Sequence, residues 1–520
     1  MRTAATSRLP ARIVVSSSWN LPYRSGVKRF GFLVAVLMVA ASCTGGAEMS
    51  ATTTSTSTAA SSTAPLSTSV PSTSTVIEAA DYGAGAAGIG DAYYPSLGNG
   101  GYDVIHYDLD LDLEYYADGL VSSAARIDAM ATDSLSSFNL DFSGWEIERL
   151  IVNGEPAEFE RSGDELVVGP VEIPVGEVFA VEMEYRGSPE PKDSVAMPFP
   201  IGWFTGPSGE QFVVAEPDAA HSWFPANDHP LDKATFTFAL TVPNGFTAAA
   251  NGELVDIVES GTTATYHWAM ADPMAPYLAT VVVTSHLQIV DDPVASAAGG
   301  VPIRNVLPSD LTTEQMTALE STGEMVQVLE VAFGPYPFDQ YGIAIVGGFP
   351  GALENQTLSV FGRVMVDAPY FEYVLVHELA HQWFGDSVSV GQWSDIWLNE
   401  GFATYAELLW VEDRYGSGAY REEVANRMEA ARIAGYGPPG IPPADDLFNG
   451  SVYQRGSFVL VALRDEVGDD AFFETLRTYT RRYTNGNAST DDFIAVAEEI
   501  SARDLTELFT TWLYGQELPG

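Results

Sequence analysis

The chain has 520 residues, a single cysteine and a formal net charge of −46, which becomes −52 if residues 1–42, with six basic residues and no acidic one, are removed. One cysteine allows no intrachain disulfide, and the strong negative charge argues against binding to nucleic acid or to an anionic membrane surface. Roughly 430 residues have a composition that can fold, which predicts two domains.

The N-terminus has the features of an export signal. Lys28 and Arg29 precede the apolar run 30–41, which is too short to span a membrane but suits a signal-peptide core. The following Ala40-Ala41-Ser42-Cys43 resembles a bacterial lipobox. We therefore expect residues 1–42 to be a lipoprotein-type signal peptide and Cys43 to carry a lipid anchor in the cell envelope. The alternative is an ordinary cleaved signal and a secreted protein.

Residues 43–90 are expected to form a disordered linker. From Thr44 to Thr75 the chain is dominated by Thr, Ser, Ala and Pro, with too few large apolar residues to form a core. Such a tether would hold the folded part, predicted to begin near Asp91, away from the membrane surface.

Residues 91–295 are predicted to form an all-β domain. The segment 107–115 (YDLDLDLEY) alternates apolar and acidic residues, as a half-buried strand does. Further strands are predicted at 166–171, 178–185, 235–242 and 277–283. The pattern changes to helical after Thr312, so the boundary is placed between Asp291 and Pro302, and 296–520 forms the second domain.

The second domain contains a predicted zinc site. An amphipathic helix is predicted over 314–331 and a strand over 341–346, followed by an apolar stretch, 370–376, that leads into His377-Glu378-Leu379-Ala380-His381. On a helix, residues four apart share a face, so His377 and His381 can bind one cation while Glu378 faces a water on that cation.

Glu400 is the candidate third ligand, since a carboxylate completes the His2Glu set of catalytic zinc sites. It opens a predicted second helix that runs to about Tyr415. The chance expectation for the HExxH pattern in this chain is below ~0.01, and we predict one Zn²⁺ per chain. The remaining histidines, at 106, 221, 229, 267 and 286, are interpreted as structural residues.

These motifs resemble the gluzincin zinc aminopeptidase family that includes aminopeptidase N and leukotriene hydrolase. The family also has 18 residues between the second histidine and the ligand glutamate, within a segment similar to WLNEGFAT, residues 397–404 here. The resemblance covers about residues 95–520. It implies a β-sandwich-like N-terminal domain followed by an α+β thermolysin-like catalytic domain, in a short form that lacks the large C-terminal helical domain of many relatives.

The resemblance also implies a site for the free amine of a peptide. Gly351-Ala352-Leu353-Glu354-Asn355 is similar to the family's GxMEN signature, with Leu353 in place of Met, and implies substrate binding by Gly351, Ala352, Glu354 and Asn355. In the family the glutamate binds the ammonium group, for which a carboxylate is the suitable partner. Glu216, before Pro217, matches a residue that assists it, although Val214 stands where the family often has Gln.

Tyr453, in the segment 452–456 (VYQRG), resembles the catalytic tyrosine of the family. Its hydroxyl could donate a hydrogen bond to the oxyanion of the tetrahedral intermediate. With Glu378 as general base, the expected activity is removal of N-terminal residues from peptides with a free amine.

Two alternatives remain: a zinc hydrolase of a non-peptide substrate, such as an epoxide, or a binding lipoprotein that has lost the chemistry.

Overall fold

The computed structural model describes residues 82–116 and 120–519. The predicted signal peptide, Cys43 and the predicted linker up to residue 81 lie outside this range. In the part of the chain that is described, no helix is long and apolar enough to cross a membrane.

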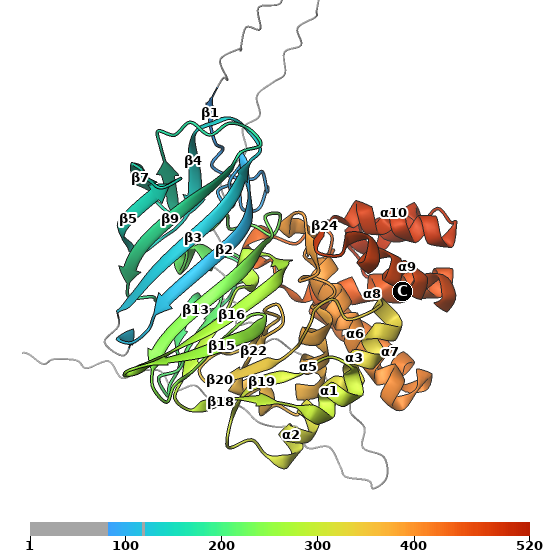
Figure 1. Cartoon of the computed structure of the whole chain (residues 1–520). Coiled ribbons are helices and arrows are strands. Elements are labelled where there is room, and N and C mark those ends of the chain that lie inside the picture. Colours follow the sequence, from blue (N-terminus) through green and yellow to red (C-terminus); the bar gives the residue numbers. More distant parts are fainter. Residues whose placement is uncertain (1–81, 117–119, 520) are drawn as a thin grey trace, which may run out of the picture. The chain divides into compact units, whose positions relative to one another are not determined.

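Three β-sheets form the N-terminal region, and β-strands in it run from Gly83 to Thr284. The largest has eight strands, most of which lie side by side in Figure 1. In sheet order they are β15 (Glu253–Ser260), β16 (Thr263–Met274), β13 (Ala234–Pro243), β2 (Tyr102–Asp112), β3 (Val121–Ala131), β9 (Val178–Gly187), β5 (Glu146–Val152) and β6 (Glu155–Pro156).

The other two sheets of this region are smaller. A four-stranded sheet has the order β1 (Gly83–Ala84), β4 (Leu135–Asp141), β8 (Glu165–Val168) and β7 (Phe159–Ser162). A five-stranded sheet has the order β10 (Pro191–Lys192), β11 (Ile201–Thr205), β12 (Gln211–Val214), β17 (Val281–Thr284) and β14 (Thr247–Ala250). The predicted all-β N-terminal domain is confirmed. Strand β1 lies inside the range predicted as linker and pairs with β4.

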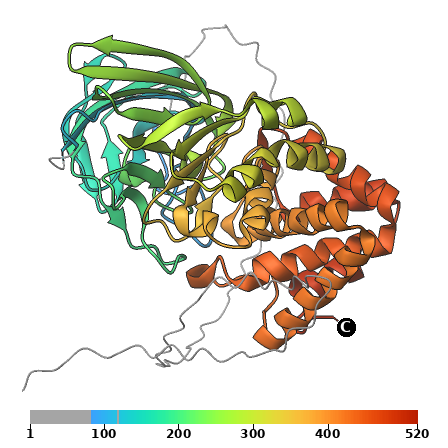
Figure 2. The ribbon, with the colours of Figure 1, turned by 90° about the horizontal axis from the view of Figure 1, so that it is seen from below.

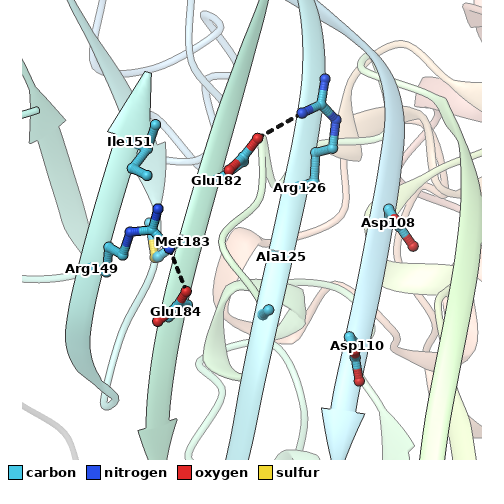
Figure 3. Close-up of a pocket in the computed structure, with 10 residues that line it drawn as sticks. Asp108, Asp110, Ala125, Arg126, Arg149, Ile151, Glu182, Met183 and Glu184 are labelled. Carbon is cyan, nitrogen blue, oxygen red and sulfur yellow. Dashed lines mark hydrogen bonds and ion pairs between the residues drawn. The ribbon is translucent and has the colours of Figure 1, made fainter. Parts of the chain in front are cut away.

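The alternation in β2 separates a buried face from a solvated one. Tyr107, Leu109 and Leu111 are fully buried, whereas the aspartates that alternate with them are exposed. On the solvated face a shallow cavity of about 250 Å³ is lined by charged side chains (Figure 3). Its two arginines, Arg126 and Arg149, form ion pairs of 2.8 and 2.7 Å with glutamates of β9. These exposed pairs are typical of a sheet face in contact with water.

Most predicted strands agree with the structure. The strands predicted at 107–115, 178–185 and 235–242 correspond to β2, β9 and β13, and β8 covers the first part of 166–171. The strand predicted at 277–283 is wrong in its first part. Pro276 opens the 3₁₀-helix η3 (Pro276–Leu278), because its fixed φ favours a helical turn, and β17 begins only at Val281.

The C-terminal region combines a mixed sheet with helices. The sheet has the order β18 (Leu287–Asp291), β19 (Arg304–Pro308), β20 (Ile343–Val346), β22 (Ser359–Gly362) and β21 (Ala352–Leu353), and β23 (Val388–Val390) pairs separately with β24 (Gly486–Ala488). The helices are α1 (Pro293–Gly299), α2 (Thr313–Glu320), α3 (Thr322–Phe333), α4 (Arg363–Val366), α5 (Phe371–Ala380), α6 (Trp397–Tyr415), α7 (Ser417–Ala434), α8 (Gly456–Val467), α9 (Asp469–Tyr483), α10 (Thr490–Ser501) and α11 (Thr506–Phe509). Figure 2 shows the helices of the C-terminal part, in orange and red, packed together.

The helix predicted over 314–331 is interrupted. It forms α2 and α3, which meet at Ser321. Two residues later, at Gly323, the backbone of α1 comes so close that a Cβ atom would lie 2.1 Å from the Ala295 carbonyl oxygen. The predicted domain boundary at 295/296 falls inside α1.

Candidate functional site

Two buried helices carry the HExxH motif and Glu400. Helix α5 contains neither Gly nor Pro, is buried from Leu375 onward and ends at His381, which is its C-cap. Helix α6 packs against α5 and is buried from Trp397 to Val411. Since packing surrounds both helices, the side chains that they bring together have little freedom to move.

The three predicted ligands meet at one point. Each of His377, His381 and Glu400 offers a donor atom, and these atoms lie within 4.8 Å of one another. Nε2 of His377 is 3.2 Å, and Nε2 of His381 3.5 Å, from the Glu400 Oε2 atom. No other histidine takes part in such a group in residues 82–116 and 120–519.

Hydrogen bonds to Nδ1 orient both imidazole rings so that their Nε2 atoms face Glu400. His377 Nδ1 donates to Glu407 Oε1 over 2.9 Å, and His381 Nδ1 donates to the Phe384 carbonyl oxygen over 3.0 Å. A carboxylate and a carbonyl can only accept, so Nδ1 carries a proton in both rings, and Nε2 of each ring is the atom that can bind a metal. This arrangement is the usual support for histidines that bind a metal.

The local charges favour a cation between the rings. Burial lowers the pKa of His377, but hydrogen bonds to Glu400 and Glu407 raise it well above its usual value. Burial raises the pKa of Glu400, but the charge of His381 and hydrogen bonds from both histidines lower it to about 2. Two imidazoles, which would release their Nε2 protons on binding a metal, and one carboxylate that stays ionised fit a zinc ion.

Glu407, Glu423 and Arg427 support the site and were not predicted. Glu407 Oε2 accepts from Arg427 Nη1 over 2.7 Å, and Arg427 Nε donates to Glu423 Oε1 over 2.8 Å. All three side chains are buried. Glu407 lies seven residues after Glu400 on α6, so helical periodicity could have placed it on the same face.

Glu378 lies directly beside the ligands. It is buried, and one of its carboxylate oxygens lies within 4.8 Å of a donor atom of Glu354 and one of His381. Burial is the main reason that the pKa of Glu378 is raised to about 8; the two histidines lower it, and Glu354 and Glu400 raise it further. A carboxyl group with a pKa near neutrality can both accept and return a proton.

Glu354 and Glu216 each present a free oxygen. Both side chains are buried, and the Oε1 atom of each has no hydrogen-bond partner among the described residues. Buried polar atoms are normally paired, so two such oxygens indicate a place for a ligand with hydrogen-bond donors. Burial raises the pKa of both carboxyl groups, and the charge of Glu354 raises that of Glu216 further.

The segment Gly351–Asn355 (GALEN) positions Glu354 at the site. Ala352 and Leu353 form β21 and pair with β22, and the Gly351 carbonyl accepts from the Gly362 N–H over 2.8 Å. Asn355 Nδ2 donates to the Leu278 carbonyl over 3.0 Å. Gln382 was not predicted, but it directly follows His381 and its Nε2 donates to the Glu354 carbonyl over 3.0 Å. The segment is thereby tied to the end of α5.

Tyr453 lies on a π-helix, η6 (Ser451–Arg455), and its ring is centred 5.9 Å from the His377 ring at an interplanar angle of 22°. π-Helical turns are frequent at functional sites. Two glycines come close together beside this turn, because a Cβ atom on Gly401 would lie 2.8 Å from Gly456, and one on Gly456 would lie 2.9 Å from Gly401. This close approach of α6 and α8 brings Tyr453 next to the residues of α6.

Comparisons with known proteins agree with this arrangement. The Peptidase M1 N-terminal domain model matches residues 104–278, and the Peptidase family M1 domain model matches residues 317–512. The chain is 26% identical over 445 residues to Aminopeptidase M1-B of Oryza sativa subsp. japonica, covering 80% of this chain and 50% of the rice protein. It is 30% identical over 328 residues to Aminopeptidase N of Streptomyces lividans, covering 58% of this chain and 37% of the Streptomyces protein. The chain thus spans half or less of the length of these curated relatives.

A solved structure matches over nearly its whole length. The M1 zinc metallopeptidase from Deinococcus radiodurans is 31% identical, with a TM-score of 0.76, and the match covers 83% of this chain and 98% of that one. A variant of that protein with a Tyr-Ser-Ala substrate bound has a TM-score of 0.75 and is covered to 99%. With both domain models matched in order and a two-domain fold shared with these structures, the chain belongs to peptidase family M1.

Proposed function

We propose that this protein is a zinc-dependent aminopeptidase that removes N-terminal residues from peptides. One observation carries the proposal: the buried carboxylates of Glu354 and Glu378 lie with His381 within 4.8 Å, beside the donor set that His381 completes with His377 and Glu400. A metal site, a general base and an acceptor for an ammonium group are therefore adjacent.

The reaction would be peptide hydrolysis. His377, His381 and Glu400 would hold one zinc ion, which would supply Lewis-acid polarisation of a water molecule and of the scissile carbonyl. Glu378 accepts the proton of the attacking water and returns it to the leaving amine. Tyr453, next to His377, donates a hydrogen bond to the carbonyl oxygen as that oxygen becomes negative.

Glu354 and Glu216 would select the free N-terminus. Their unpaired Oε1 atoms can accept charge-assisted hydrogen bonds from the peptide ammonium group. Fixing the ammonium places the first peptide bond, rather than an internal one, at Glu378. Similar structures support ligands of this class. A variant of the Deinococcus radiodurans protein holds Tyr-Ser-Ala, and two-domain M1 zinc metallopeptidase variants hold L-tryptophan and L-arginine, each of which has a free α-amine.

Turnover of aminoacyl amides tests the proposal. We expect hydrolysis that a chelator abolishes and zinc restores, and a strong preference for free over N-acetylated substrates. Glu354→Ala should remove most of that preference, whereas Glu320→Ala, which changes an exposed carboxylate on α2, should retain it. Zinc-loaded protein that hydrolyses no aminoacyl amide would instead favour the epoxide-type hydrolase or the inactive binding lipoprotein.

We also propose that the protein is exported and anchored through a lipid on Cys43. Support comes from the sequence: an apolar run of signal-peptide length and a lipobox-like AASC at residues 40–43. Mass spectrometry of the mature N-terminus tests the proposal, with a diacylated Cys43 expected. An unmodified N-terminus downstream of Cys43 would identify a secreted protein.

A further inference from the structure

The segment Asp91–Leu97 precedes both matched domain models, of which the first begins at residue 104. Asp91 ties this segment to the catalytic region. Its Oδ1 accepts from the backbone N–H groups of Tyr93 and Tyr94 over 2.6 and 3.3 Å, and its Oδ2 accepts from the Trp393 N–H over 2.7 Å and from His229 Nε2 over 3.1 Å. Trp393 begins the 3₁₀ turn Trp393–Asp395, so the segment lies against the turn that precedes α6, the helix that carries Glu400.

Three aromatic rings connect this segment to the site. Tyr94 packs edge-on against Trp393 with ring centres 5.9 Å apart, and Trp393 lies 5.3 Å from Tyr277. We call these three residues the aromatic row. All three are buried, yet Tyr94 Oη, Trp393 Nε1 and Tyr277 Oη have no hydrogen-bond partner among the described residues.

One end of the row lies next to the segment that carries Glu354, because Asn355 Nδ2 donates to the carbonyl oxygen of Leu278, the neighbour of Tyr277, over 3.0 Å. Burial and then the charges of Asp218 and Glu216 raise the pKa of the Tyr94 hydroxyl, and burial and then Glu354 and Glu216 raise that of Tyr277. Unpaired hydroxyl groups and unpaired carboxylate oxygens therefore lie close together. Since buried polar atoms are rarely unpaired, the whole group is suited to a polar ligand.

We propose that Tyr94 is a specificity-determining residue, whose hydroxyl hydrogen-bonds a polar or cationic side chain on the N-terminal residue of the peptide. The inference rests on the proposed aminopeptidase function. An arginine side chain fits because it supplies only donors, to which the Tyr94 oxygen and the Asp218 carboxylate can act as acceptors, and because a guanidinium group packs well on aromatic faces. The aromatic row also offers apolar surface, so a leucine side chain would bind without using the hydroxyl.

The neighbouring tyrosine provides a matched control. Tyr93 is adjacent in sequence, but its hydroxyl donates to the Pro442 carbonyl over 2.6 Å and so has a structural partner. Tyr94→Phe should lower the ratio of kcat/KM for arginyl over leucyl amides about tenfold, the effect of one hydrogen bond to a charged group. Tyr93→Phe should leave the ratio unchanged, and both variants should keep the wild-type zinc content.

A binding measurement separates recognition from chemistry. In zinc-loaded Glu378→Ala protein, adding Tyr94→Phe should weaken the binding of an Arg-Ala dipeptide about tenfold and that of Leu-Ala less than twofold. Active wild-type enzyme with an unchanged arginyl-to-leucyl ratio in Tyr94→Phe overturns the inference alone. An equal loss in Tyr93→Phe also overturns it, because the effect would then come from the placement of the segment. Zinc-loaded wild-type protein without aminopeptidase activity refutes the proposed function and this inference with it.

Discussion

Replacing Glu407 by Gln tests how much the unpredicted support of His377 contributes to metal binding. In the native protein one carboxylate oxygen accepts from His377 Nδ1 and the other from Arg427 Nη1. A glutamine has one accepting oxygen, so only one of these bonds survives. Either the imidazole loses its orienting acceptor, or the amide N–H₂ group faces the Arg427 guanidinium.

The expected loss follows from these contacts. Removing a partner of a metal-binding histidine lowers metal affinity by about 10- to 100-fold, equivalent to about 1.4–2.8 kcal/mol. Arg427 keeps its 2.8 Å bond to Glu423, so its buried charge stays paired. The fold should therefore survive, with a stability loss of about 1–3 kcal/mol.

The assay is competition for zinc against a chromophoric chelator. Glu412→Gln is the control, because Glu412 lies on the same helix and pairs with an arginine, Arg464, but does not contact His377. We expect Glu407→Gln to lose at least about tenfold in zinc affinity and Glu412→Gln to lose less than twofold. Equal affinities in wild type and Glu407→Gln would refute the role given to Glu407.

Two further predictions concern stability. Gly456→Ala places a Cβ atom 2.9 Å from Gly401, so it should destabilise the fold by about 1–3 kcal/mol in chemical denaturation. Gly418→Ala is the control: its Cβ position in α7 has open space, so the substitution should be neutral or stabilising. Equal effects of the two substitutions would contradict the close approach of α6 and α8. His221 is buried, which lowers its pKa, and so does the charge of Lys192, whose Nζ lies 2.6 Å from Nε2. The carboxylates of Asp164, 3.7 Å from Nε2, and Asp228, 2.7 Å from Nδ1, outweigh both and raise the pKa from 6.5 to about 9. The protonated ring therefore contributes stability that is complete below pH 6.5 and is lost as pH rises through 9, so His221→Gln should remove about 3 kcal/mol of pH dependence in that window; an unchanged slope would contradict the buried charge.

Local sequence patterns predicted the helices that carry the candidate site. The HExxH motif determines its own helix, since an apolar stretch without Gly or Pro leads into it, and α5 forms over that stretch. Glu400 was predicted as a ligand because carboxylate ligands are typical of such sites, and α6 begins three residues before it. The alternation in β2 likewise specified its buried face, because a strand repeats every two residues.

The features that were missed depend on contacts between distant segments. Arg427 reaches Glu407 from the next helix, and Asp91 bonds to Trp393 across 302 positions of the chain. Neither has a local pattern, because each is one charged residue whose partner is chosen by the tertiary fold. The interruption at Ser321 has the same origin, since it accompanies the packing of α1 against Gly323.

Zinc content and turnover of Glu378→Ala, measured on the same preparation, test the proposed mechanism most directly. Because Glu378 is the base and not a ligand, the variant should retain one zinc per chain and lose at least about 100-fold in kcat for aminoacyl amides. A variant that retains zinc and near-normal turnover would contradict the mechanism, and so would one whose activity is lost only because the zinc is lost.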